Sequence, residues 1–170
     1  MIGGSATGRL VVISGGQSGT DRAALDAALG LGLAVSGWCP KGRWAEDGPI
    51  APSYPLRETA SSDPAERTEA NVRDAEATLV LTLGSMDEGT QRTVAAAGRL
   101  GKPCLVIDLG VVDETPTACE WFARLKPASL NVAGPRESNA LGLYGRAQLF
   151  LEDLFRNVAF DDDLDQHARR

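Results

Sequence analysis

The sequence predicts a single α/β domain, a three-layer sandwich built on a mainly parallel sheet of about five strands. Short apolar runs rich in β-branched residues alternate along the chain with segments long enough to form helices. The best of these runs are apolar at nearly every position, which is typical of strands that helices cover on both faces. A chain of 170 residues also falls in the usual size range of one domain.

Each element can be placed from local signals. The five expected strands lie at residues 10–14, 33–37, 78–83, 104–109 and 129–133. The five expected helices lie at residues 21–31, 64–75, 89–100, 117–125 and 143–158. Gly30 and Gly32 mark the end of the first helix, and Pro64 is a favourable first-turn residue for the second. The order of strands and helices therefore indicates a Rossmann-like arrangement.

Three segments differ in character from these elements. We expect residues 1–9 to be a flexible N-terminus, residues 10–158 to form the ligand-binding domain, and residues 159–170 to be an acidic tail. Because the tail carries many like charges, we expect it to be a frayed end. Prolines and glycines break any helix between residues 38 and 64, which predicts a long loop, and loops of this length often serve as lids or binding loops.

Composition narrows the function classes. The net charge of −6 argues against binding along a nucleic-acid backbone, which depends on clustered Lys and Arg. No apolar run approaches the roughly 18 residues that a membrane helix needs, and no export signal is present, so we expect a cytoplasmic protein. The single histidine, His167, lies in the acidic tail, so one chain cannot assemble a Ser-His-Asp triad or a histidine zinc site. The three cysteines have no metal-ligand spacing, and we expect no metal site built from protein ligands.

The strongest motif is the glycine-rich turn between the first strand and the first helix. Glycines allow close approach of a ligand, and the amides of a first helical turn attract a phosphate or carboxylate. The predicted phosphate-binding residues here are Gly15, Gly16, Gln17, Ser18, Gly19, Thr20 and Asp21. The alternative is an ordinary tight turn in which Thr20 or Asp21 caps the helix.

Two further turns follow strands and can face the same crevice. After the third strand, Gly84, Gly89 and Thr90 are candidate phosphate ligands, whereas Asp87 and Glu88 would repel a phosphate unless Mg²⁺ bridges them or they contact sugar hydroxyls. The alternative is a helix start whose acidic residues answer the helix dipole.

Arg136 follows the last strand and can offer a bidentate fork to an oxyanion. Its alternative is a surface pair with Glu137.

The long loop carries a mixed set of candidates. Lys41 and Arg43 can meet an anion, and Glu46 or Asp47 can act as an acid or base if burial raises its pKa. Trp38 and Trp44 can stack on a flat ring, or they can attach a solvated loop to the body of the protein. Arg67 and Asn71 share one face of the next helix, where most charges are solvated.

Taken together, the blocks GGQSGTDRAALD, GWCPKGRWAEDGPI, Arg67-Thr68-Glu69, Asn71-Val72-Arg73-Asp74, Gly89-Thr90 and NVAGPRES resemble one family. This family is described as molybdenum carriers and as a circularly permuted branch of the SLOG group of Rossmann-like nucleotide-binding proteins. The resemblance implies a nucleotide or molybdenum cofactor as the anionic ligand, and self-association into a homo-oligomer.

The wider group also includes lysine-decarboxylase-like phosphoribohydrolases, which release a base from a nucleoside monophosphate. Their glycine-rich catalytic motif is only partly matched, because Thr93 stands where the catalytic glutamate would be. The leading hypothesis is therefore a binding or carrier protein. Two alternatives stay open: a nucleotide-processing enzyme that uses Glu46, Asp47, Asp87 or Glu88, and a nucleotide-sensing module whose partner contacts the long loop.

Overall fold

The computed structural model describes residues 10–111 and 114–167, with the side chains of the last helix described as far as Val158. Its centre is a five-stranded sheet in the order β2-β1-β9-β7-β8, and every neighbouring pair is parallel. The strands are β1 (Val11–Ile13), β2 (Ala34–Ser36), β7 (Ala77–Thr82), β8 (Cys104–Asp108) and β9 (Ser129–Ala133). The predicted α/β, Rossmann-like architecture is confirmed.

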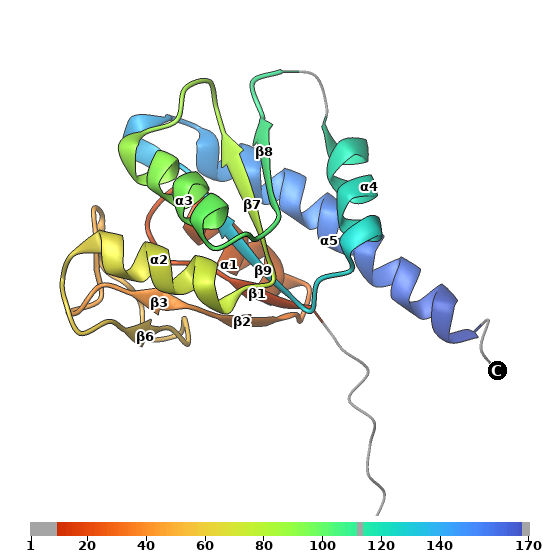
Figure 1. Ribbon diagram of the computed structural model, residues 1–170, viewed down its shortest axis with the longest axis horizontal. Helices are drawn as coiled ribbons and strands as arrows, with labels where there is room; N and C mark the ends of the chain where they lie inside the picture. Colours follow the sequence, from red (N-terminus) through yellow and green to blue (C-terminus); the bar gives the residue numbers. More distant parts are fainter. Residues whose placement is uncertain (1–9, 112–113, 168–170) are drawn as a thin grey trace, which may run out of the picture.

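Helices cover both faces of this sheet, which explains the continuous apolarity of the central strands (Figure 1). The helices are α1 (Thr20–Gly30), α2 (Pro64–Asp74), α3 (Glu88–Arg99), α4 (Thr115–Leu125) and α5 (Leu143–His167). One face packs against α1, α4 and α5 through a large core that includes Leu79, Leu130 and Leu151. On the other face, Val72 of α2 contacts Ala96 and Ala97 of α3 in a smaller core.

The end of the last helix differs from the prediction. Instead of ending at Val158, α5 runs to His167, so most of the expected frayed tail is helical. Once a helix is anchored, each added residue gains one backbone hydrogen bond, and propagation can pass through an unfavourable acidic run. The anchor is strong, because Leu151, Leu154 and Phe155 are buried in the main core. The expected flexible N-terminus, residues 1–9, lies outside the described residues.

The long loop also has structure that the sequence did not reveal. It contains two short pairs: β3 (Trp38–Cys39) beside β6 (Arg57–Glu58), and β4 (Trp44–Ala45) beside β5 (Gly48–Pro49). A small core beneath the loop joins it to Leu25 of α1. The other buried members are Cys39, Ala45, Ile50 and Leu56. The loop is therefore a packed substructure rather than an open lid.

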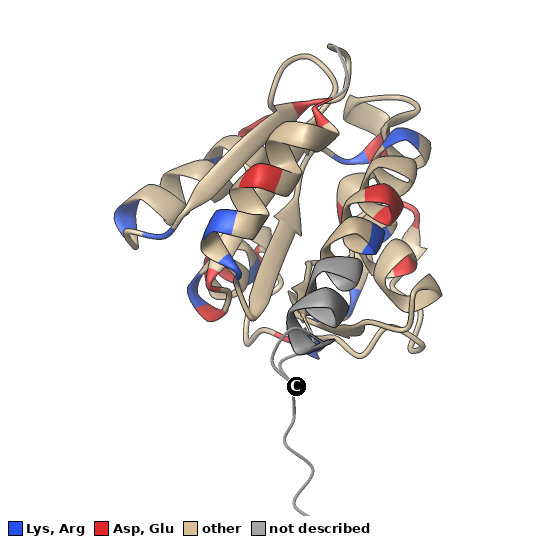
Figure 2. Cartoon of the chain, turned by 90° about the vertical axis from the view of Figure 1, so that its right-hand side faces the viewer, with Lys and Arg blue, Asp and Glu red and all other residues tan. Residues whose placement is uncertain are grey.

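The sheet order determines where a ligand can bind. The chain leaves β1 towards α1 on one face and leaves β7 towards α3 on the opposite face, with β9 between them (Figure 1). Such a divergence opens a crevice at the carboxyl ends of the strands. The turns that follow β1, β7 and β9 all meet at this edge. Figure 2 shows acidic and basic residues interspersed along the helices that face this view, without a continuous basic stripe on that side.

Candidate functional site

A cleft of about 290 Å³ lies at this divergence of the chain. Its walls are the turns after β1, β7 and β9, together with the first two turns of α2 and α3. The lining residues are Gln17, Asp21, Pro64, Ala65, Arg67, Thr68, Asp87, Glu88, Gly89, Thr90, Arg92, Thr93, Ala133, Gly134, Arg136 and Asn139. We call this space the switch-point cleft.

The turn after β1 does not present the open amides that the sequence predicted. The Gln17 amide donates to Asp21 Oδ2 at 3.3 Å, and the Ser18 amide donates to the Gln17 side chain at 3.0 Å. The Thr20 amide points at the carbonyl oxygen of Pro135, 3.4 Å away. Three of the expected phosphate donors are thus already bonded within the protein, and binding of a ligand by residues 15–21 stays a prediction. From this turn, Gln17 and Asp21 line the cleft.

Its glycines make room for protein rather than for a ligand. Gly19 has a φ of +77°, and a Cβ built there would lie 2.5 Å from the Pro135 carbonyl oxygen. A Cβ on Gly15 would lie 1.8 Å from Nη1 of Arg67. The predicted close approach is therefore real, but the approaching groups are the turn after β9 and an arginine of α2.

Arginines from three separate elements line the cleft. Arg67 of α2 is the deepest, with 15% of its side chain exposed and Nη1 2.8 Å from Asp21 Oδ2. Arg136 is 35% exposed and lies 3.9 Å from Glu46, so it does not form the expected pair with Glu137. Arg92, 55% exposed, pairs with Glu88 one helical turn earlier. Guanidinium groups suit bidentate recognition of phosphate or carboxylate oxygens.

The cleft also contains two carboxyl groups whose pKa values are shifted in opposite directions. Burial raises the pKa of Asp21 against the opposing effect of its Arg67 partner. Burial opposes ionisation of Asp87 as well, but hydrogen bonds from Thr90 and Asn139 outweigh it and hold the Asp87 pKa below its ordinary value. Asp87 is therefore the ionised N-cap of α3, as the alternative interpretation of this turn expected, and its bond to Asn139 measures 2.8 Å. Gly89, Thr90 and the buried Thr93 lie beside it on the cleft wall.

Two proposed acids of the loop do not line the switch-point cleft. Glu46 accepts hydrogen bonds from the hydroxyls of Ser18 and Ser138, and from the Ser138 amide at 3.1 Å. Burial opposes its ionisation, but these bonds outweigh it, so the Glu46 pKa is lowered rather than raised. Asp47 pairs with Arg22 at 3.1 Å. Glu46 instead ties the loop to the turns after β1 and β9.

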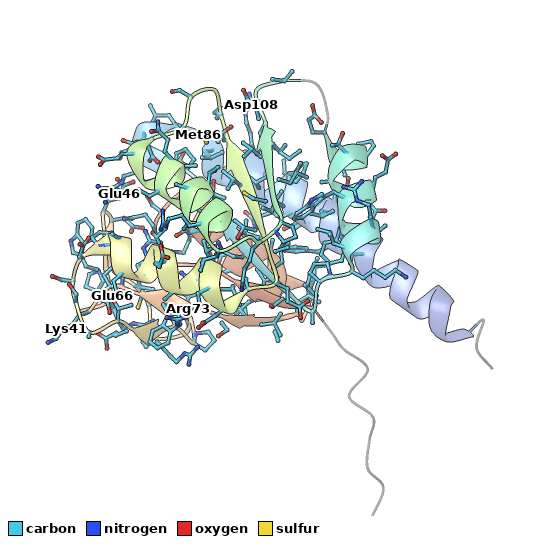
Figure 3. The ribbon with its side chains drawn as sticks, viewed as in Figure 1. Lys41, Glu46, Glu66, Arg73, Met86 and Asp108 are labelled. Atoms are coloured by element: carbon cyan, nitrogen blue, oxygen red, sulfur yellow. The ribbon has the colours of Figure 1, made fainter. Side chains whose placement is uncertain are left out.

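The loop cations are not placed for an anion in the cleft either. The Arg43 guanidinium donates to four backbone carbonyls of its own loop, those of Ile50, Ala51, Tyr54 and Leu56, at 2.8–3.1 Å. Lys41 is exposed at the outer end of the loop and projects away from the sheet (Figure 3).

Gly84, the candidate phosphate ligand after β7, also does not line the cleft. Its amide donates to Asp108 at 2.9 Å.

Sequence reasoning passed over several lining residues. Arg67 was given little weight and Arg92 was not considered, because a charged residue on a helix is usually solvated. The direction of each side chain depends on how α2 and α3 pack. Asn139 lies in a 3₁₀ turn (Glu137–Asn139) that the sequence did not signal. Gly15 has no positive φ in the structure and leaves clearance for Arg67, but the sequence shows only a glycine after a strand.

A search for clusters of three or more His, Cys, Asp or Glu side chains that could hold a metal ion found none among the described residues. The cleft offers guanidinium, hydroxyl and amide groups beside the carboxylates of Asp21, Asp87 and Glu88. The guanidinium, hydroxyl and amide donors suit an oxyanion.

Comparison with known proteins gives two matches for this chain. Residues 12–155 match the model of the circularly permutated YpsA SLOG family. The chain belongs to this family. It is also similar to the crystal structure of a "Putative molybdenum carrier protein" from Syntrophus aciditrophicus SB, with 38% identity and a TM-score of 0.82. That match covers 87% of this chain and 95% of the other.

A search of curated proteins returned no match. No described helix combines the length and apolar character that crossing a membrane requires.

Proposed function

We propose that this member of the circularly permutated YpsA SLOG family binds a phosphate-bearing or similar anionic small molecule in the switch-point cleft and carries it without converting it. The observation that supports this best is the convergence of Arg67, Arg92 and Arg136 from three elements on one cleft at the carboxyl edge of the sheet. This is the edge where open parallel sheets bind ligands.

Three features favour a carrier over an enzyme. Asp87 is engaged as a helix cap by Thr90 and Asn139, which leaves it poorly placed to move a proton. Thr93, buried at the cleft, cannot replace a catalytic glutamate. Asp21 has a raised pKa but is bound to Arg67 and to the Gln17 amide.

The ligand class follows from size and charge. A cleft of about 290 Å³ is at the lower end of the range for small-molecule sites and can take part of a nucleotide. The similar protein from Syntrophus aciditrophicus carries a name that refers to molybdenum. Molybdate, tungstate and molybdenum cofactor therefore belong in a test panel beside nucleotides.

A thermal-shift screen of the full chain tests the proposal. A ligand present at 100 times its dissociation constant stabilises the native state by about 2.7 kcal/mol, roughly 5–10 °C for a chain of this size. We expect such a shift from at least one nucleoside phosphate or oxyanion, and intact ligand on recovery. No shift from any anion of the panel would refute the binding proposal, and recovery of a free base would make the protein an enzyme.

Arg92→Ala has a matched control in Arg156→Ala. Both residues form an i,i+4 pair with a glutamate on a helix, and both are about equally exposed. We expect Arg92→Ala to reduce the ligand-induced shift and Arg156→Ala to leave it unchanged. Equal effects from the two variants would count against a role for the cleft.

A further inference from the structure

Building on the proposed function, we propose that the switch-point cleft selects a terminal tetrahedral oxyanion, either a phosphomonoester or a free oxyanion such as phosphate or molybdate. Arg67 would hold it in a bidentate fork, with Asp21 as the positioning residue of that fork. A phosphodiester would then bind more weakly, because it carries one negative charge fewer and has a substituent on both sides, so that it cannot enter the cleft as a terminal group.

The depth of the three arginines gives the orientation of the ligand. The exposed fraction of the side chain rises from 15% at Arg67 through 35% at Arg136 to 55% at Arg92. Since Arg67 is the least exposed of the three, we place the oxyanion at Arg67 as the terminal group of its ligand. The rest of the ligand then extends past Arg136 towards Arg92 and solvent.

The residues around Arg67 are arranged to keep it there. Asp21 Oδ2 accepts from Nη1 at 2.8 Å, and Asp21 is itself fixed by the Gln17 amide. Gly15 leaves the space that the guanidinium occupies, since a Cβ would lie 1.8 Å from Nη1 and 2.8 Å from Cζ. Three residues of the first glycine-rich turn thus serve one arginine of α2.

The hydrogen bonding of Arg67 is incomplete. Its Nε is buried and has no hydrogen-bond partner among the described residues, whereas Asp21 engages only Nη1. Nε and Nη2 share the side edge of a guanidinium, the edge that pairs with two oxygens of one phosphate. A small movement of the side chain towards an oxyanion would give both groups an acceptor.

Isothermal titration of the full chain with matched ligand pairs tests the selection. The probes are the four nucleoside 5′-monophosphates and the phosphodiesters formed by methylating their phosphates. Inorganic phosphate and molybdate serve as competitors. We expect the best monophosphate to bind at least about tenfold more tightly than its ester, because the ester lacks one negative charge and its methyl group would have to lie against Arg67. Competition by phosphate or molybdate would then show which source of oxyanion the cleft prefers.

Arg67→Lys separates bidentate recognition from charge alone, because lysine keeps the charge but not the fork. We expect Arg67→Lys and Gly15→Ala to weaken binding of the monophosphate at least about tenfold, and the surface control Arg156→Lys to leave it unchanged. Asp21→Asn should weaken binding without abolishing it. If a variant fails to fold, the wild-type ratio of monophosphate to ester affinity still decides.

Different results would refute the proposed function and the selection by Arg67. Absence of binding by every probe would refute the proposed function itself. Equal affinity for a monophosphate and its ester, or unchanged monophosphate affinity in folded Arg67→Lys, would refute only the selection by Arg67.

Discussion

Arg43 illustrates how one side chain can organise a loop from within. Its guanidinium donates hydrogen bonds to four backbone carbonyls between residues 50 and 56, and it does so from a left-handed backbone conformation with φ of +53°. Removing it takes away the donor to the partly buried carbonyls of Ile50 and Leu56, whereas those of Ala51 and Tyr54 keep a backbone donor.

We expect Arg43→Ala to lower the free energy of unfolding by about 2–4 kcal/mol, since it breaks a local hydrogen-bond network. Lys41→Ala, two residues away and exposed, should change it by less than about 0.5 kcal/mol. Urea denaturation followed by circular dichroism measures both. Similar values for the two variants would show that Arg43 does not hold the loop.

This residue also marks a limit of sequence interpretation. A cation in a loop rich in proline and glycine suggests a ligand site. Nothing in the local sequence pattern shows that the partners of Arg43 are backbone carbonyls seven to thirteen residues further along the chain. The same limit applies to Glu46, whose partners Ser18 and Ser138 lie 28 and 92 residues away. Position relative to a strand end was a better guide: Arg136, Gly89 and Thr90 do line the cleft.

At the scale of elements, the turns after β1 and β9 form one unit through their backbones. Gly19 approaches Pro135, and Gly134 approaches the Leu81 carbonyl oxygen so closely that a Cβ would lie 2.1 Å from it. Neither backbone can move aside without shifting a strand.

We therefore expect Gly19→Ala to destabilise the protein by about 2 kcal/mol or more, because it combines a positive φ with a backbone clash. The control is Gly145→Ala in α5, where a Cβ meets nothing within 4 Å. That variant should be neutral or more stable by up to about 1 kcal/mol. Thermal unfolding compares the pair, and a mild effect of Gly19→Ala would mean that the two turns can separate.

The existence and order of the strands and of α1 to α5 could be predicted because apolar runs and helix-ending signals are local properties. The pairs β3–β6 and β4–β5 could not, since each strand has two residues and depends on the packing of Ile50 and Leu56 against α1. The length of α5 was underestimated for the opposite reason: a local charge pattern was weighed without the core that anchors the helix.

For the whole molecule, the lowered pKa values of four carboxyl groups predict that the folded state loses stability in acid. The pKa values of Glu46, Asp74, Asp87 and Asp108 are lowered by hydrogen bonds or by arginine partners that outweigh any burial. A group with a lowered folded-state pKa stabilises the protein above its unfolded pKa, and this stability is lost as pH falls through the folded value. The pKa of Asp21 is raised, so this group makes the folded state less stable once the pH is above the ordinary pKa of an aspartate. Asp21 is one such group, whereas four groups have a lowered pKa.

We expect the free energy of unfolding to decrease as pH falls below about 5, and to decrease less steeply in Glu46→Gln. Urea titrations between pH 3 and pH 7 measure this, with Glu152→Gln, which removes the partner of Arg156 on α5, as the control. A flat profile in the wild-type protein would show that these contacts do not stabilise the native state.

The position of β9 has a consequence for biosynthesis. β9 is the last strand to be synthesised, yet it occupies the middle of the sheet, between β1 and β7. Until residues 129–133 leave the ribosome, β1 and β7 cannot be joined and each keeps an unpaired edge, which is a template for aggregation. We expect a chain truncated before Ser129 to aggregate rather than to form a smaller sheet, and folding during translation to wait for the final quarter of the chain.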